Sequence, residues 1–118
     1  MIQNKQSESS LQISCVKWLQ FQYSSLVWFH VPNGGKRNIR EAVRFKREGV
    51  KAGIADLILL RPNKTKHGLC IELKTKIGKQ SPEQKEFQKQ TEFWNYQYKV
   101  CRNLDEFMKT VNDYIFDI

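Results

Sequence analysis

The sequence predicts an α/β fold in which helices flank a central mixed four-stranded sheet, in the order αβαββαβα. Two observations support this prediction. Segments with apolar residues at helical spacing alternate with short apolar runs rich in β-branched and aromatic residues. Capping patterns and clusters of Gly, Pro and Asn mark the boundaries between them. A chain of 118 residues has room for one core, so we expect a single domain over 1–118, with 1–6 as a frayed start.

The first part of the chain is expected to form a helix and then a strand. From about 7 to 22 the apolar residues Leu11, Cys15, Trp18 and Leu19 recur at helical spacing. The run over 26–31 is β-branched and aromatic, which favours a strand. The Pro, Asn and Gly residues of 32–35 then predict a tight loop.

A second, short helix is predicted from its capping pattern. Asn38, with Glu41 three residues later, forms a capping-box pattern, and Gly49 suits the end of the helix. Ile39, Ala42 and Phe45 follow at helical spacing, which places the basic residues of this region on a short helix.

Apolar runs over 55–60 and 69–74 predict two central strands joined as an antiparallel hairpin. Ser81-Pro82 with Gln84 predicts a capped helix from Pro82 to about Asn95. Its expected apolar stripe is Phe87, Thr91 and Trp94. A last strand over 97–101 and a closing helix capped by Asn103 and Glu106 complete the order.

Charge gives the first indication of function. The net charge is +8, and a basic protein attracts polyanions. Between positions 36 and 51 seven basic residues stand against Glu41 and Glu48. They form a local patch: Lys36, Arg37, Arg40, Arg44, Lys46, Arg47 and Lys51.

The remaining composition excludes several classes of protein. The three cysteines, Cys15, Cys70 and Cys101, are scattered among apolar residues and are expected to be buried, which excludes a disulfide framework and a zinc site. No apolar run is long enough to cross a membrane and the first residues do not resemble a signal peptide. We therefore expect a cytoplasmic protein, in a bacterium or a phage-infected cell.

Asp56, Glu72 and Lys74 are the candidate chemical centre. Alternation along a strand places Glu72 and Lys74 on one face, with Ile71 and Leu73 on the other. Strand pairing brings Asp56 beside Glu72, and two carboxylates without a histidine favour Mg²⁺, for which Mn²⁺ would substitute. Such a trio suits phosphodiester hydrolysis. The alternative interpretation of the same spacing is a surface ion pair between Glu72 and Lys74.

The wider pattern resembles a known nuclease signature. Gly53-Ile54-Ala55-Asp56, followed after fifteen residues by Glu72-Leu73-Lys74, is similar to the PD-(D/E)xK motif. The blocks at 30–35, with Arg37, and at 46–53, together with Ser81 and Gln84, resemble the virus-type replication-repair nuclease (VRR-NUC) family over about residues 8–101. Ala55 stands where that family usually has proline, which contributes stiffness and no chemistry.

The resemblance implies a restriction-endonuclease-like core and assigns roles to the site residues. Asp56 and Glu72 would bind the metal, the Leu73 carbonyl would add a ligand, and Lys74 would serve the nucleophile. Two further catalytic candidates are Glu8, at the family's acidic helix position, and Gln84, at its glutamine after the motif. Both also have a simpler interpretation, as a first-turn acid and a capping residue respectively.

Several other residues are predicted to contact DNA. The expected phosphate-binding set is Asn33, Gly34, Gly35, Lys36, Arg37, Arg40, Arg44, Arg47 and Lys51. Lys76 and Ser81 are further candidates. His30 is a third, although a histidine in an aromatic strand is more often a packed core residue.

The leading hypothesis is a Mg²⁺-dependent endonuclease acting on DNA in replication, recombination or repair. Stand-alone members of the family resemble Holliday junction resolvases, which implies branched DNA, a homodimer and a phage-type origin. Three alternatives stay open: a nuclease of linear, flapped or single-stranded DNA, a non-catalytic nucleic-acid-binding module, and a protein-interaction domain with an acidic partner.

Overall fold

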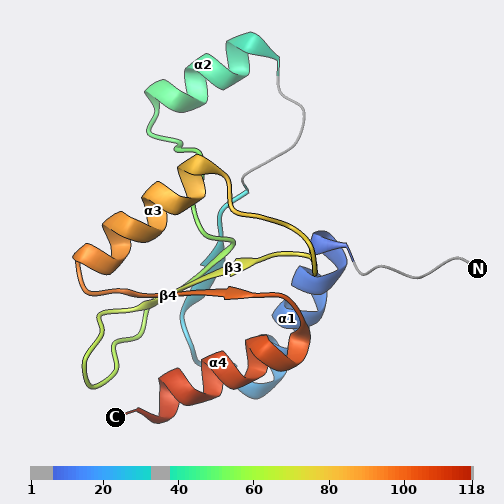
Figure 1. Cartoon of the computed structure of the whole chain (residues 1–118), viewed down its shortest axis with the longest axis vertical. Coiled ribbons are helices and arrows are strands. Elements are labelled where there is room, and N and C mark those ends of the chain that lie inside the picture. The colour runs from blue at the N-terminus through green and yellow to red at the C-terminus, as the bar shows by residue number, and fades with distance from the viewer. Residues whose placement is uncertain (1–6, 33–37, 118) are drawn as a thin grey trace, which may run out of the picture.

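The computed structural model describes residues 7–32 and 38–117, and its element order is the predicted αβαββαβα (Figure 1). The helices are α1 (Glu8–Gln22), α2 (Ile39–Arg47), α3 (Pro82–Phe93) and α4 (Leu104–Phe116), and the strands are β1 (Trp28–His30), β2 (Leu57–Leu59), β3 (Leu69–Leu73) and β4 (Gln97–Cys101). The frayed start predicted for 1–6 and the candidates Asn33, Gly34, Gly35, Lys36 and Arg37 lie outside the described residues.

The four strands form one mixed sheet in the order β1-β2-β3-β4. β1 with β2 and β2 with β3 are antiparallel pairs, which confirms the predicted hairpin and the central position of these two strands. β4 runs parallel to β3. A parallel neighbour needs a crossover connection, and α3 provides it.

Each helix starts at a side chain that caps it. Ser7, Asn38, Ser81 and Asn103 each accept a hydrogen bond from a backbone N–H in the first turn of the helix that follows. At α3 the capping box is complete, because the Gln84 side chain also accepts from the backbone N–H of Ser81. These caps satisfy N–H groups that have no partner within the helix, and for this reason the helix starts were predictable.

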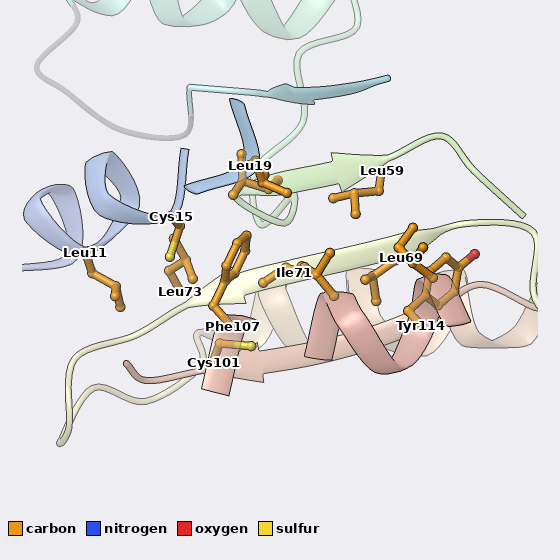
Figure 2. Close-up of a cluster of buried hydrophobic side chains, with 13 residues drawn as sticks. Leu11, Cys15, Leu19, Leu59, Leu69, Ile71, Leu73, Cys101, Phe107 and Tyr114 are labelled. Atoms are coloured by element: carbon orange, nitrogen blue, oxygen red, sulfur yellow. The ribbon is translucent and has the colours of Figure 1, made fainter. Parts of the chain in front are cut away.

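The main core lies between one face of the sheet and helices α1 and α4 (Figure 2). Ile71 and Leu73 of β3 point into it beside Phe107 and Tyr114 of α4. Cys15 and Cys101 belong to this core, and Cys70 is buried on the other face, so all three cysteines are free and buried as predicted. Burial raises the pKa of the Cys15 thiol to about 12 and that of Cys70 to about 11, which keeps both thiols protonated at neutral pH.

A smaller apolar cluster lies on the opposite face, under α3. Ala55, Cys70 and Tyr98 are buried there, and Phe87 of α3 packs against them. Trp94 was expected to continue the α3 stripe, but its side chain is 68% exposed. It lies at the C-cap, beyond the last turn of α3. The predicted stripe is therefore wrong at this position.

Helix α2 stands apart from the sheet (Figure 1). The helix and its cap are as predicted, but none of its residues Ile39–Arg47 is buried. Ile39 is 83% exposed and Ala42 is also exposed, so the apolar residues at helical spacing on α2 do not pack into the core. Among the described residues, every helix is too short or too polar to span a lipid bilayer.

Candidate active site

Asp56, Glu72 and Lys74 converge where β2 and β3 pair. β3 is buried at all five positions, and side chains alternate across it. Cys70, Glu72 and the following Lys74 therefore lie on the α3 side, with Ile71 and Leu73 in the main core, as predicted. Leu57 pairs with Ile71, and one step further in this antiparallel register places Asp56 opposite Glu72.

Glu72 has an asymmetric environment. Its side chain is fully buried, and its Oε1 accepts hydrogen bonds from the Tyr98 hydroxyl and from Nε2 of Gln80, the latter at 3.0 Å. Its Oε2 has no hydrogen-bond partner, and among the described residues no other buried side-chain nitrogen or oxygen lacks one. Because a buried polar atom without a hydrogen bond is costly, Oε2 is the atom of Glu72 that could bind a cation.

Lys74 supplies the neighbouring positive charge. Its Nζ lies 3.7 Å from the Glu72 Oε2, and the two side chains are 10% and 0% exposed. The alternative of a surface ion pair is therefore wrong. Inside the protein this charge acts at a low effective dielectric constant and is less screened by salt than a surface charge.

Asp56 is held by the strand that carries Glu72. Its Oδ2 accepts a hydrogen bond of 2.6 Å from the backbone N–H of Leu73. Burial raises the pKa of Asp56, the Leu73 hydrogen bond lowers it, and the charges of Glu8 and Glu72 raise it further. Both acids thus repel the Asp56 carboxylate, and a bound cation would relieve that repulsion.

Gly53 brings the Asp56 segment against α3. Its φ of +82° favours glycine, and a Cβ there would lie 2.8 Å from the backbone nitrogen of Gln84. Asp56 and Gln84 consequently line one cleft of about 830 Å³, together with Glu8 of α1 and His30 of β1. The structure thus brings Glu8, Gln84 and His30 together with Asp56 in one cleft.

His30 is exposed, so the expectation of a packed core histidine is wrong. Residues at the end of edge strand β1 are open to the cleft, and Nδ1 of His30 donates a hydrogen bond of 2.6 Å to the carbonyl of Asp56. Ser81 and Gln84 have the simpler predicted role, because each caps α3 through the other's backbone. Gln84 additionally lines the cleft.

Two similarities to known proteins identify the family of this chain. The model of the VRR-NUC domain matches residues 6–104. The chain belongs to the VRR-NUC family. A solved structure named "VRR_NUC domain protein" is similar over 94% of this chain and 89% of that chain, with a TM-score of 0.79 and 29% sequence identity. No curated protein matches the chain. The VRR-NUC assignment confirms the predicted fold and a nuclease-type function.

The VRR-NUC site suits a divalent cation. Carboxylate oxygens are the ligands that hard divalent metals prefer, and one buried oxygen, Oε2 of Glu72, accepts no hydrogen bond among the described residues. Across 7–32 and 38–117, no three His, Cys, Asp or Glu side chains gather closely enough to hold a metal ion. Glu8 therefore shares the cleft with Asp56 without completing a three-carboxylate cluster, and the side chains able to hold a cation are Asp56 and Glu72.

The structure adds cleft residues that the sequence analysis missed. One wall of the cleft is α1, which contributes Gln12, Lys17 and Gln20. Gln12 and Gln20 follow Glu8 at multiples of four residues, so helical spacing from that acid would have indicated this wall. Gln80 and Tyr98 were also missed, because their contacts with Glu72 span 8 and 26 positions and no local pattern predicts them.

The described residues of the predicted basic patch lie on α2 and just after it, and none of them lines the cleft. Arg40, Arg44 and Arg47 are exposed and line a separate hollow of about 570 Å³ with Ile39 and Val43. The closest acid, Glu48, is 4.0 Å from Arg44, and both side chains are more than half exposed, so this pair neutralises little of the charge. Lys51 and Lys76 are exposed as well.

Proposed function

We propose that this VRR-NUC domain is a metal-dependent endonuclease that hydrolyses phosphodiester bonds in DNA. The observation that supports the proposal most strongly is the buried Glu72 carboxylate. One of its oxygens is held by two donors, and the other has no hydrogen bond and lies 3.7 Å from the Lys74 ammonium. A structural ion pair would gain from a direct hydrogen bond here, whereas a metal site needs a free oxygen.

Asp56, Glu72 and the Leu73 carbonyl would hold the ion, Mg²⁺ with Mn²⁺ as a substitute. When bound, the metal supplies Lewis-acid polarisation of the scissile phosphate. Lys74 orients the attacking water and offsets negative charge that develops on the phosphate. Its near-complete burial fixes the ammonium before substrate arrives.

Glu8 and Gln84 act from the cleft walls. Both side chains line the cleft that contains Asp56, within the space where the scissile phosphate would enter. We assign Glu8 to water or a second cation at the entrance, and the Gln84 side-chain N–H groups to the substrate, since its Oε1 is used in the α3 cap.

DNA would be held at two places. Within the cleft, Lys17 of α1 provides positive charge. Outside it, Arg40, Arg44, Arg47 and Lys51 would contact the phosphate backbone. The remaining predicted contacts are Asn33, Gly34, Gly35, Lys36, Arg37, His30, Lys76 and Ser81, of which 33–37 lie outside the described residues.

Branched DNA such as a four-way junction is the proposed substrate, and a homodimer the proposed assembly. Two symmetric nicks require two active sites related by a two-fold axis. The exposure of Ile39 and Val43 beside the α2 arginines is typical of a surface that a partner covers. Replication, recombination and repair are the processes in which such a substrate occurs.

The decisive experiment measures cleavage of labelled four-way junction, flapped duplex, linear duplex and single strand in Mg²⁺, in Mn²⁺ and in EDTA. Wild type is compared with Lys74→Ala and with Lys109→Ala, whose exposed lysine pairs with Asp113. We expect paired nicks in the junction that require metal and are lost only in Lys74→Ala. Equal cutting of linear DNA would reject the junction preference, and binding without metal-dependent cutting would indicate a non-catalytic module.

A further inference from the structure

The geometry around Glu72 points to a role for two residues with no assigned function. We infer that Gln80 and Tyr98 are positioning residues that hold the Glu72 carboxylate with Oε2 free, and that they thereby set the affinity of the site for its divalent cation. This inference rests on the proposed function, because it concerns the same metal site.

Tyr98 is fixed by its place in the sheet. In the parallel β3–β4 ladder it pairs with Cys70, two residues before Glu72, so its side chain lies on the same face as the carboxylate. The residue is 6% exposed, and the Phe87 ring packs edge-on against its ring with centroids 6.2 Å apart. The hydroxyl has one proton, and that proton is donated to the Glu72 Oε1.

Gln80 is fixed by a chain of amides. Its Nε2 donates to the Glu72 Oε1 at 3.0 Å and to the Gln88 Oε1 at 2.9 Å, so both of its N–H groups are used. Gln88 in turn donates to Glu92 at 3.3 Å. Since both acceptors are oxygens, only one orientation of the Gln80 amide satisfies them.

The loop that carries Gln80 is itself anchored. Nη1 of Arg102, the residue directly after β4, donates to the carbonyls of Thr75 at 2.8 Å and Gly78 at 2.7 Å. β4 therefore supplies Tyr98, and the residue directly after β4, Arg102, secures the loop that carries Gln80. Glu72 is held by a strand, a loop and a helix whose positions depend on one another.

This arrangement favours coordination of a cation through one oxygen of Glu72, Oε2. Both donors act on Oε1, so a rotation that presented both oxygens equally to a cation would break two hydrogen bonds. Without either donor the carboxylate gains freedom to turn toward Lys74, whose Nζ is 3.7 Å from Oε2. Loss of an outer hydrogen bond to a metal ligand lowers metal affinity by roughly 10- to 100-fold in proteins generally.

The test is calorimetric titration of Mn²⁺ into wild type, Tyr98→Phe and Gln80→Met, with cleavage measured as a function of Mn²⁺ concentration. Matched controls are Tyr96→Phe, a tyrosine whose ring contacts His67, and Gln90→Met, whose amide bonds Glu86 on the exposed side of α3. We expect the Kd for Mn²⁺ to rise by about 10- to 100-fold in the two test variants only. The cleavage rate should recover at saturating Mn²⁺.

A purely structural role would lower the fraction of folded protein without moving the half-saturating Mn²⁺ concentration. An unchanged Kd in Gln80→Met, a loop substitution that spares the core, would overturn the inference whatever Tyr98→Phe does to folding. A failure of the proposed function would give a different result. Wild type would then show no Mn²⁺ binding that is lost when Glu72 is replaced by Gln.

Discussion

Strand β3, with the candidate catalytic carboxylate, and helix α2, with the basic patch, are built in opposite ways. Strand β3, which carries Glu72, is buried at every position, and the carboxylate is held by a tyrosine, a glutamine and a lysine. Helix α2, which carries the arginine patch, has no buried residue. The chemical group is therefore fixed by tertiary packing, whereas the charged groups that would hold substrate are fixed only to their own helix.

The difference matches the demands on each part. Metal binding and phosphate chemistry require atoms placed within fractions of an ångström. Attraction to a phosphate backbone depends on charge over longer distances and tolerates mobile side chains. Changes on β3 should therefore alter the chemical step, and changes on α2 should alter binding.

The largest expected effect comes from Glu72→Gln. This change keeps the shape of the side chain and removes the charge that would hold the cation. We expect cleavage to fall by about 10³-fold, because several kcal/mol of metal-derived stabilisation is lost, while DNA affinity persists. Single-turnover cleavage and fluorescence anisotropy measure the two quantities. Glu86→Gln, on the surface of α3, is the control, and normal cutting by Glu72→Gln would refute the site.

The second effect concerns α2. Replacing Arg40, Arg44 and Arg47 together by Gln should weaken DNA binding and reduce the salt slope of log Kd by about 2 to 3, since each phosphate contact contributes about 0.9. The rate at saturating DNA should change little. The control variant removes the same amount of charge elsewhere, by replacing three exposed lysines with Gln: Lys64, Lys99 and Lys109. Equal slopes in the two triple variants would show that α2 has no special contact with DNA.

Two glycines with positive φ test the same difference between an exposed and a tightly packed segment at the level of the backbone. Gly49 ends α2 with a φ of +103° and open space around it, whereas Gly53 has a φ of +82° and lies against the α3 backbone. Alanine at either position should cost about 1–2 kcal/mol of backbone strain. At Gly53 a further ~1–3 kcal/mol is expected from the steric clash, together with loss of activity.

Urea unfolding followed by cleavage assays separates the two glycine variants. Gly49→Ala should remain active in proportion to its folded fraction. Gly53→Ala should lose activity even where it is folded, because Asp56 and Gln84 would shift relative to each other. Equal stability and activity of the two variants would contradict the close contact at α3.

The smallest effect is expected at Lys17. It is exposed and lines the cleft, so Lys17→Gln should remove about one phosphate contact and lower the salt slope by about 1. KM should rise several-fold without a change in kcat. Binding isotherms at several salt concentrations test this, with Lys109→Gln as the control. An unaltered slope would place the DNA away from α1.

Much of the fold could be predicted because the signals for it are local. The predicted caps at Asn38, Ser81 and Asn103 depend on residues a few positions apart. The same is true of the alternation of Glu72 and Lys74 against Ile71 and Leu73. The predicted pairing of the two central strands also placed Asp56 beside Glu72 correctly.

Features that depend on distant packing could not be predicted. The burial of Glu72, its bonds to Tyr98 and Gln80, and the exposure of His30 and Trp94 follow from how strands and helices meet. The exposure of the apolar residues on α2 could not be predicted for the same reason: their spacing predicts the helix correctly, but whether a face is covered depends on what lies beside it.

The freedom of α2 has an evolutionary consequence. Because none of its side chains is buried, mutations there would change the proposed DNA contacts at little cost to folding, whereas most substitutions on β3 would be removed by selection before their effect on activity mattered. A duplicated copy of such a gene could therefore acquire a new DNA preference by drift and selection in α2 alone, and inherit its hydrolytic centre unaltered.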